Sequence, residues 1–570
     1  MPTSVSLPKL LFLNISLLLV ACAFVAIYFS SLELPVRRNR VASGDGADHD
    51  CKIFHSLEGY RAKCLYLKSN GPCVSQGYID YLNLFYCDLG RFPWLGHTLL
   101  FLWLLVLFYL LANTASDYFC PSLEHLSKLL KLSPTIAGVT LLSLGNGAND
   151  VFASLVSFKG SGTSDIGFNA VLGGAFFVSC VVVGIISISF RGRGIQVKRH
   201  DIVRDVCFLL VVLLCLLVIL ITGVINFFGA VGFTLIYIVY VFVVYISSTR
   251  WNNGVSGDSE RNGNPRYDTD LRVPLLMEEG VFDCNEESDR EFGLKIEKRC
   301  CMRSLLCQKT LWILQMPLYL PRRLTIPVVC EETWSKPYAI SSVTLAPLLL
   351  CVIWIPYKEN SFFNTDLIIY GIGLLIGIIF GVASFFTTKS SRPPKKCLFP
   401  WLAGGFIMSV TWSYISAQEL VGLLVSLGFI CGISPSILGL TVLAWGNSLG
   451  DLMTNLTMVL KGGSEGAQVA ISGCYAGPIF NTLIGLGLSL IISTWSKYPS
   501  SLVIPFDPYL LETLAFFVGG LVVALVVLIR RDMRLDEVLG GWLLIIYFIF
   551  LFLRLIQTLG PFQFYTLRWE

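Results

Sequence analysis

Residues 132–150 read LSPTIAGVTLLSLGNGAND, and residues 433–451 read ISPSILGLTVLAWGNSLGD. At an offset of 301 residues, most positions of the first stretch find an identical or similar partner in the second. The matched positions of the first copy are Ser133, Pro134, Ile136, Gly138, Thr140, Leu142, Gly145, Asn146 and Asp150. Each copy ends on an aspartate in apolar surroundings. Chance does not readily give this agreement, so the two stretches indicate an internal repeat.

The composition around the repeat is typical of a membrane protein. The chain has 570 residues, of which 54% are hydrophobic and 14% charged, whereas soluble domains carry about 25% charged residues. Apolar runs such as 94–113, 202–222 and 541–558 are long enough to cross a hydrocarbon core of ~30 Å. We therefore expect an all-α multi-pass protein, which excludes a soluble enzyme. The net charge of +4 gives no indication of nucleic acid binding.

The apolar runs predict about 13 spans. An initial run to about residue 30 is a signal anchor or a signal peptide. The other spans are expected near 94–115, 134–157, 166–190, 202–222, 226–247, 338–356, 366–386, 402–426, 435–460, 468–493, 508–530 and 538–558. The chain then divides into 1–31, a Cys-bearing lumenal or extracellular segment 32–93, a first five-helix repeat 94–247, a cytosolic loop 248–335, two linking spans in 336–400, and a second five-helix repeat 401–570.

Segment 32–93 contains Cys51, Cys64, Cys73 and Cys87. Four cysteines next to a signal-like segment favour two disulfides in an oxidising compartment. A zinc site is the alternative, but the spacing has no CxxC pair. The pairing cannot be read from the sequence.

The distribution of basic residues predicts the topology. If 32–93 is lumenal or extracellular, the short cytosolic loops hold Arg191, Arg193, Lys198, Arg199, Arg204, Lys389, Arg392, Lys395, Lys396, Arg530, Arg531 and Arg534. The opposite loops hold only Lys358 and Lys497, which fits the positive-inside rule. One conflict remains, because Arg37, Arg38 and Arg40 lie on the wrong side. The two aspartate-bearing spans then run in opposite directions, and inverted repeats with interrupted helices are typical of secondary transporters.

Each repeat motif has a local structural interpretation. Ser133-Pro134 and Ser434-Pro435 fit the N-cap and first position of a helix. The helix then rises roughly 16 Å, about half of the hydrocarbon thickness, before Gly145 or Gly446. We expect the following Gly-Asn pair to loosen the helix there and free carbonyl groups for an ion.

The carboxylates of Asp150 and Asp451 follow about one helical turn later. An ionised aspartate at membrane depth costs several kcal/mol unless it is paired, and neither span contains Lys or Arg. Oxygen donors from these aspartates and from Asn146, Asn447, Ser448 and Asn481 suit hard cations such as Ca²⁺, Na⁺ and K⁺. An aspartate can also cap a helix break, but two at matched positions favour an ion site.

The second part of the repeat is less alike. Residues 169–178 read NAVLGGAFFV and 472–481 read SGCYAGPIFN. Gly174 matches Gly477; these glycines either allow close helix packing or expose backbone atoms to an ion. Val178 of the first copy occupies the position of Asn481 in the second. Because only the second copy keeps a polar end, the sequence predicts an asymmetric site.

The motifs GNGAND at 145–150 and GNSLGD at 446–451, with the inverted repeat, resemble those of the sodium/calcium exchanger superfamily. The chain is most similar to its cation/calcium exchanger branch and also to the mitochondrial sodium/lithium/calcium exchanger. The resemblance covers about 94–247 and 402–558. It implies ion ligands from the second and third helices of each half, which by position are Asn146, Asn149, Asp150, Asn447, Ser448, Asp451, Gly477 and Asn481.

The resemblance implies an antiporter that exchanges Ca²⁺ for Na⁺, K⁺ or H⁺ by alternating access, with no resident cofactor. Relatives often have Pro where this chain has Asn149, and Val178 removes a polar group that other exchangers use for Na⁺. Members of the branch are also described as H⁺-dependent K⁺ and Na⁺ transporters, which is the alternative function. Two carboxylates neutralise one Ca²⁺ or two monovalent ions, and Asn481 adds no charge.

Two other classes of membrane protein are alternatives to the antiporter. An intramembrane aspartyl protease also needs two membrane aspartates, and 448–451 faintly resembles its GxGD element, but the first Gly is missing. A cation channel would use the same ligands without requiring a counter-ion. No mitochondrial presequence is visible, so the expected location is the vacuolar, endoplasmic reticulum or plasma membrane. The sequence does not fix the oligomeric state.

Overall fold

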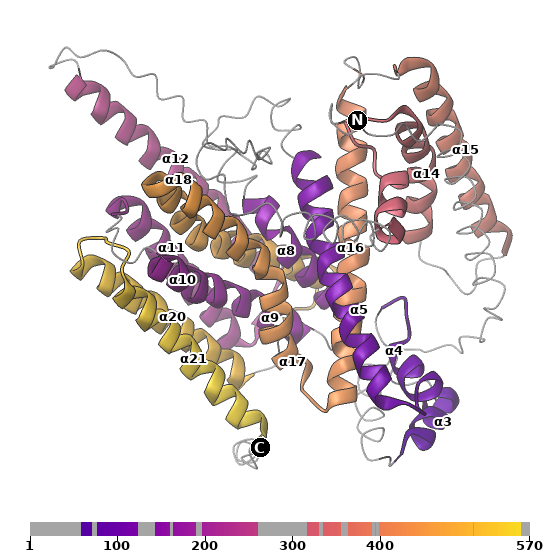
Figure 1. Cartoon of the computed structure of the whole chain (residues 1–570), viewed down its shortest axis with the longest axis horizontal. Helices are drawn as coiled ribbons and strands as arrows, with labels where there is room; N and C mark the ends of the chain where they lie inside the picture. The colour runs from indigo at the N-terminus through magenta and orange to yellow at the C-terminus, as the bar shows by residue number, and fades with distance from the viewer. Residues whose placement is uncertain are drawn as a thin grey trace, which may run out of the picture. The chain divides into compact units, whose positions relative to one another are not determined.

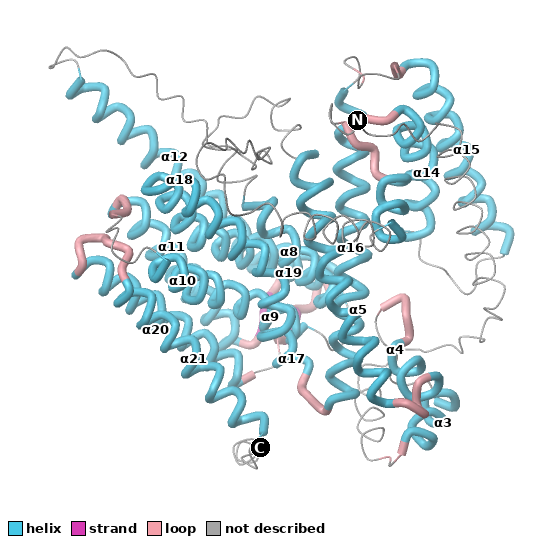
Figure 2. The backbone as a smooth tube through the Cα atoms, viewed as in Figure 1, coloured by secondary structure: helices cyan, strands magenta, loops and turns pink. Residues whose placement is uncertain are grey.

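The helices of this protein are described from a computed structural model. It describes residues 57, 59–70, 77–122, 143–159, 164–189, 196–259, 316–329, 334–354, 363–389, 394, 398–504 and 507–559. Almost all of these residues belong to one packed unit within 58–570. Most of them form helices; the rest form loops, one pair of two-residue strands and an isolated bridge between Gln196 and Arg534 (Figure 2).

The first half of the chain contains the elements that lead from the Cys-bearing segment through the first repeat (Figure 1). Here η marks a π-helical segment. The elements are α3 (Tyr60–Asn70), α4 (Tyr81–Asn83), η1 (Leu84–Asp88), α5 (Pro93–Thr114), η2 (Ala115–Phe119), α8 (Ser143–Lys159), α9 (Ser164–Phe176), η4 (Phe177–Val182), α10 (Val183–Ser189), α11 (Arg199–Thr222), β1 (Val224–Ile225) and α12 (Phe227–Ser259).

The second half contains a helix at 316–325, the two linking helices and the second repeat. These elements are α14 (Lys336–Trp354), α15 (Phe363–Thr387), α16 (Leu398–Cys431), α17 (Pro435–Leu438), η5 (Gly439–Leu443), α18 (Ala444–Phe480), η6 (Asn481–Leu486), α19 (Gly487–Ser496), β2 (Leu502–Val503), α20 (Pro508–Arg530) and α21 (Glu537–Leu559).

Among the described residues, ten helices are long and apolar enough to cross a membrane. Their outward faces are apolar as well; on α5, the side chains of Phe101 and Leu102 are more than half exposed. Exposed aromatic and aliphatic side chains in such numbers are stable in hydrocarbon and costly in water. The protein is therefore an all-α multi-pass membrane protein, as expected. The first predicted span, and the beginning of the span predicted at 134–157, lie outside the described residues.

The span that carries Asp451 and the next span are parts of one continuous helical stretch, α18, in which the chain reverses. A Cβ built on Gly466 would lie 2.2 Å from the carbonyl oxygen of Met458. In a straight helix these residues would be separated by a rise of roughly 12 Å. The chain therefore turns back between them, and the part of α18 after the turn lies in the candidate span Gly466–Ser496, close to the span predicted at 468–493.

The interior of the unit is built around α9, η4 and α10. These elements pack against α8, α18, α20 and α21, and Phe176 is fully buried among Phe517, Tyr547 and Phe550. Close approach at the crossing with η5 depends on glycine. A Cβ on Gly173 would lie 2.4 Å from the carbonyl oxygen of Leu440.

A short antiparallel pair connects the two repeats at one end. Val224 pairs with Val503, and Ile225 pairs with Leu502. The strands follow α11 and α19, so residues from both repeats meet here. The two linking helices α14 and α15 pack tightly on each other, with Gly377 against the backbone of Thr344, and α14 contacts α16.

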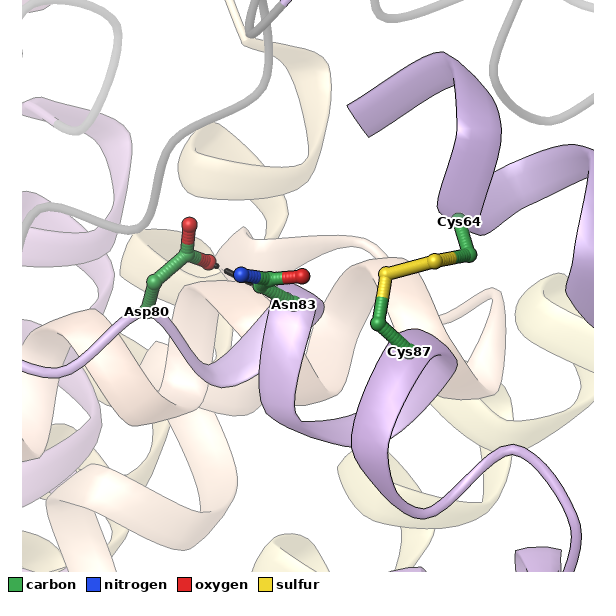
Figure 3. The surroundings of a disulfide bond; sticks show 4 residues. All are labelled: Cys64, Asp80, Asn83 and Cys87. Atoms are coloured by element: carbon green, nitrogen blue, oxygen red, sulfur yellow. Dashed lines mark hydrogen bonds between the residues drawn. A yellow bond between two sulfur atoms is a disulfide. The ribbon is translucent and has the colours of Figure 1, made fainter. Parts of the chain in front are cut away.

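The Cys-bearing segment is partly described and contains one disulfide. Cys64 of α3 is bonded to Cys87 of η1 (Figure 3). Next to it, the side chain of Asp80 accepts a hydrogen bond from the backbone N–H of Asn83 and caps α4. The predicted disulfide class is confirmed for this pair, while Cys51 and Cys73 lie outside the described residues.

One local expectation was wrong. The helix does not loosen at the Gly-Asn pair of either copy, because α8 and α18 are α-helical there; the irregular turn of the second copy is η5, which ends just before Ala444. The ring of Phe108 packs against Gly446, 2.1 Å from where a Cβ would be. The helix α12 continues to Ser259, whereas the candidate membrane span within it ends at Ser247, where the predicted cytosolic loop begins.

Candidate cation site

Asp150 is the centre of the candidate site. It lies on α8, one helical turn beyond Asn146, and only 5% of its surface is exposed. Asn447 of α18 donates a hydrogen bond through Nδ2 to Oδ1 of Asp150 at 2.9 Å. Asn481, the first residue of η6, donates through Nδ2 to Oδ2 at 2.6 Å. Two residues from the second predicted repeat therefore bind the carboxylate of a residue in the first.

These hydrogen bonds fix the direction of both amides. A carboxylate only accepts, so each amide must turn its nitrogen toward Asp150. The amide oxygens of Asn447 and Asn481 then point elsewhere, and both are buried without a hydrogen-bond partner among the described residues. The same holds for Oδ1 of Asn149 and Oγ of Ser448.

A group of buried oxygen atoms without donors requires an explanation, because nearly all buried polar atoms in proteins are paired. Each unpaired oxygen costs about 1–3 kcal/mol. A hard cation satisfies several carbonyl, hydroxyl and carboxylate oxygens at once. The donor set therefore fits a small cation better than it fits a structural hydrogen-bond network.

Asp451 is the second carboxylate. It lies on α18 one turn after Asn447, is half-buried, and interacts electrostatically with Asp150. None of the ion pairs between described residues includes either aspartate. Two negative groups thus share one region without a basic side chain to balance them, which favours a cation between them.

Glycines shape the space around Asp150. A Cβ on Gly174 would lie 3.3 Å from Oγ of Ser448 and 3.6 Å from Oδ2 of Asp150, so the α9 backbone borders the site. A Cβ on Gly147 would lie 2.0 Å from Oδ1 of Asn481. Any larger residue at Gly147 would displace the amide that binds Asp150.

The structure brings five of the eight predicted ligands together. Asp150, Asn447 and Asn481 are joined by hydrogen bonds, Ser448 lies near them across Gly174, and Asp451 interacts electrostatically with Asp150. Three predicted ligands are not placed in contact with these residues. Asn149 is half-buried on α8, the side chain of Asn146 lies outside the described part, and no atom lies within 4 Å of a Cβ on Gly477.

Sequence reasoning missed three residues around the site. Gly147 makes room for Asn481, and its place inside the GNGAND motif was a usable signal. Thr482 is fully buried next to Asn481, and its Oγ1 has no partner in the described structure. Phe108 covers Gly446 from α5, a contact between distant segments that no local pattern reveals.

The donors at the site are oxygen atoms, unlike the thiolates and imidazoles of transition-metal centres. In the described ranges, no group of three or more His, Cys, Asp or Glu could hold a metal ion. Two carboxylates with neutral amide and hydroxyl oxygens bind a hard ion without thiolates or imidazoles. Such a set is suited to an ion that binds and leaves.

The chain is similar to known ion exchangers over nearly its whole length. The family described as sodium/calcium exchanger protein is matched over residues 100–246 and 401–556. Cation/calcium exchanger 2 of Arabidopsis thaliana is 51% identical over 549 residues, covering 95% of this chain and 96% of that protein. The mitochondrial sodium/calcium exchanger protein of Rattus norvegicus is 31% identical over 542 residues, covering 90% of each chain. Among solved structures, the crystal structure of the H⁺/Ca²⁺ exchanger CAX matches over 79% of both chains at 10% identity with a TM-score of 0.40.

Proposed function

The chain belongs to the sodium/calcium exchanger protein family, and on this premise we propose that it is a secondary active antiporter that exchanges Ca²⁺ for a monovalent cation. Both matched ranges, 100–246 and 401–556, fall on the two predicted repeats. Membership of a family of ion exchangers also makes the chain a transporter and not an enzyme. The intramembrane protease alternative is therefore not retained.

One observation carries the proposal: Asp150 is held by Asn447 and Asn481, whose own amide oxygens are left without partners. The arrangement positions a carboxylate and leaves neutral amide oxygens beside it without hydrogen-bond partners, which is what a cation site requires. We propose Asn146, Asn149, Asp150, Asn447, Ser448, Asp451, Gly477 and Asn481 as the ligand set.

Charge limits what the site can carry. Asp150 and Asp451 together neutralise one Ca²⁺ or about two monovalent ions. Neutral oxygens then complete the coordination without adding charge. Ca²⁺ and the monovalent ions would neutralise the same two carboxylates, so binding of one kind of ion excludes the other. This mutual exclusion is required for exchange through a single site.

We propose Na⁺ as the monovalent partner. Support comes from the name of the 31% identical relative, a mitochondrial sodium/calcium exchanger protein, and from the hard oxygen donors of the site. The Cys64–Cys87 disulfide supports a membrane with one oxidising side, so the vacuolar, endoplasmic reticulum and plasma membranes remain the proposed locations.

Vesicles that contain the purified protein and are loaded with Ca²⁺ test the function and its partner. Na⁺, K⁺ or a proton gradient is offered outside in turn, and Ca²⁺ efflux is followed. We expect efflux with Na⁺ and none without a counter-ion. Efflux that needs no counter-ion would instead show a channel, and proton-driven K⁺ or Na⁺ flux without Ca²⁺ movement would show the alternative transporter.

A further inference from the structure

A second buried carboxylate, Glu419 of α16, lies outside the cation site and is bound by the disulfide-bearing segment. Only 7% of Glu419 is exposed. Tyr81 donates a hydrogen bond through its hydroxyl to Oε2 at 2.6 Å, and the backbone N–H of Tyr78 donates to Oε1. The backbone of Ile79 donates a further hydrogen bond.

The donors fit this carboxylate closely. A Cβ on Gly77 would lie 3.0 Å from Oε2, so a larger residue there would crowd Glu419. Burial and the hydrogen bond to Glu419 raise the pKa of the Tyr81 hydroxyl well above its ordinary value, so the hydroxyl remains a donor. Trp103 of α5 donates to the oxygen of Tyr81 at 2.9 Å, which brings α5 into the same network.

The disulfide closes the part of the chain that supplies these donors. Cys64 and Cys87 are separated by 23 residues, and Tyr78, Ile79 and Tyr81 all lie between them. Helix α16 also packs against α5 and against α8, the helix of Asp150. The contacts therefore lead from the disulfide through Glu419 and α16 to the helix that carries the central carboxylate.

We propose that Glu419 is a positioning residue for transport, which fixes α16 against α5 and α8 by binding the disulfide-closed segment 64–87. This inference rests on the proposed antiport. When the segment is released, Glu419 loses its donors and becomes an unpaired carboxylate at membrane depth, which is costly. Helix α16 must then shift to bring Glu419 to water. Helix α8 would then no longer be packed against a fixed α16 when the cation site opens and closes.

The expected effect is on the rate of transport and not on ion binding. Asp150 keeps its own hydrogen bonds to Asn447 and Asn481 when the segment is released. A step that depends on helix movement slows the maximal rate while the apparent Ca²⁺ affinity is kept. We expect the maximal rate of exchange to fall at least about threefold.

Reduction of the folded, reconstituted protein tests the proposal without requiring a variant to fold. The impermeant phosphine tris(2-carboxyethyl)phosphine is added on the face that carries the segment; it cleaves the disulfide to two thiols and takes an oxygen from water. The maximal exchange rate of the wild type should fall. Glu419→Gln and the double variant Cys64→Ser, Cys87→Ser should have a low maximal exchange rate before the phosphine is added, and its addition should not lower that rate further. Glu512→Gln, an acid that faces Arg554 and not this segment, should retain the wild-type response.

Hydrogen exchange of the amides of Tyr78 and Ile79 supplies a readout that is independent of transport. These amides should be protected in the oxidised wild type and exchange faster after reduction and in Glu419→Gln. Transport that continues at the wild-type rate after reduction or in Glu419→Gln would overturn the proposal, as would a response that persists in the double cysteine variant. Absence of any exchange activity in the oxidised wild type, with the amides protected, would instead overturn the proposed function and the positioning role with it.

Discussion

Gly147 shows how a single residue determines the geometry of the site. Replacement by Ala would place a Cβ 2.0 Å from Oδ1 of Asn481, so the amide must leave Asp150. We expect Gly147→Ala to lower the apparent Ca²⁺ affinity at least about tenfold, the equivalent of one lost charge-assisted hydrogen bond. Gly450→Ala is the matched control, because no atom lies within 4 Å of its Cβ. Equal affinity of the two variants in a Ca²⁺ titration of exchange would contradict this reading.

The charge of the site can be altered at Asn481. Asn481→Asp replaces the donor on Asp150 with a third carboxylate of the site, at hydrogen-bond distance from Asp150. Two carboxylates so close share a proton near neutral pH, because they cannot both ionise readily. A Ca²⁺ ion must displace that proton, so exchange by the variant should rise with pH between about pH 6 and about pH 8 more steeply than exchange by the wild type. A pH dependence identical to that of the wild type would exclude Asn481 from contact with the ion-binding carboxylate.

At the level of elements, the helix at 316–325 is joined to α5 by a fully buried arginine. Arg322 donates to Oγ1 of Thr114 at 3.1 Å and to the carbonyl oxygen of Leu318, and it lies over the ring of Tyr118. The end of the loop predicted at 248–335 is therefore packed against the first repeat. Arg322→Ala should lower the stability by about 2–4 kcal/mol, because it removes these contacts and leaves Thr114 without its donor. Thermal unfolding in detergent measures this loss.

Two variants control for that result. Thr114→Val keeps the shape of the side chain and should cost about 1 kcal/mol. Arg530→Ala changes an exposed arginine at the end of α20 and should have little effect. A stability loss for Arg530→Ala as large as that for Arg322→Ala would show that the contacts of Arg322 do not account for its effect.

The sequence predicted where the helices lie better than it predicted their internal irregularities. Apolar runs located α5, α11, α20 and α21 within a few residues, because span length follows directly from membrane thickness. The π-helical turns η4, η5 and η6 were not predicted. They depend on packing between distant segments, such as Gly439 against the backbone of Ile166. Two of them, η4 from Phe177 and η6 from Asn481, begin at nearly equivalent positions of the predicted repeats.

At the scale of the whole molecule, the repeat motif predicted which residues meet. Asp150 and Asn447 are far apart in the chain, yet the repeat indicated that their motifs share one site, and their side chains are hydrogen-bonded. The inverted arrangement of the two repeats remains a prediction. The role of Gly147 and the binding of Glu419 by segment 64–87 were not foreseen. Both depend on contacts of single atoms across segments that have no sequence similarity.

The central claim is that the oxygen atoms around Asp150 and Asp451 bind the transported ion. Equilibrium binding of labelled Ca²⁺ to the purified protein tests it most directly, with Na⁺ added as a competitor. The wild type should bind one Ca²⁺ per chain and release it to Na⁺. Asp150→Asn should lose this binding, while Asp532→Asn, a change at an exposed loop residue, should keep it. Unchanged Ca²⁺ binding by Asp150→Asn would contradict the account.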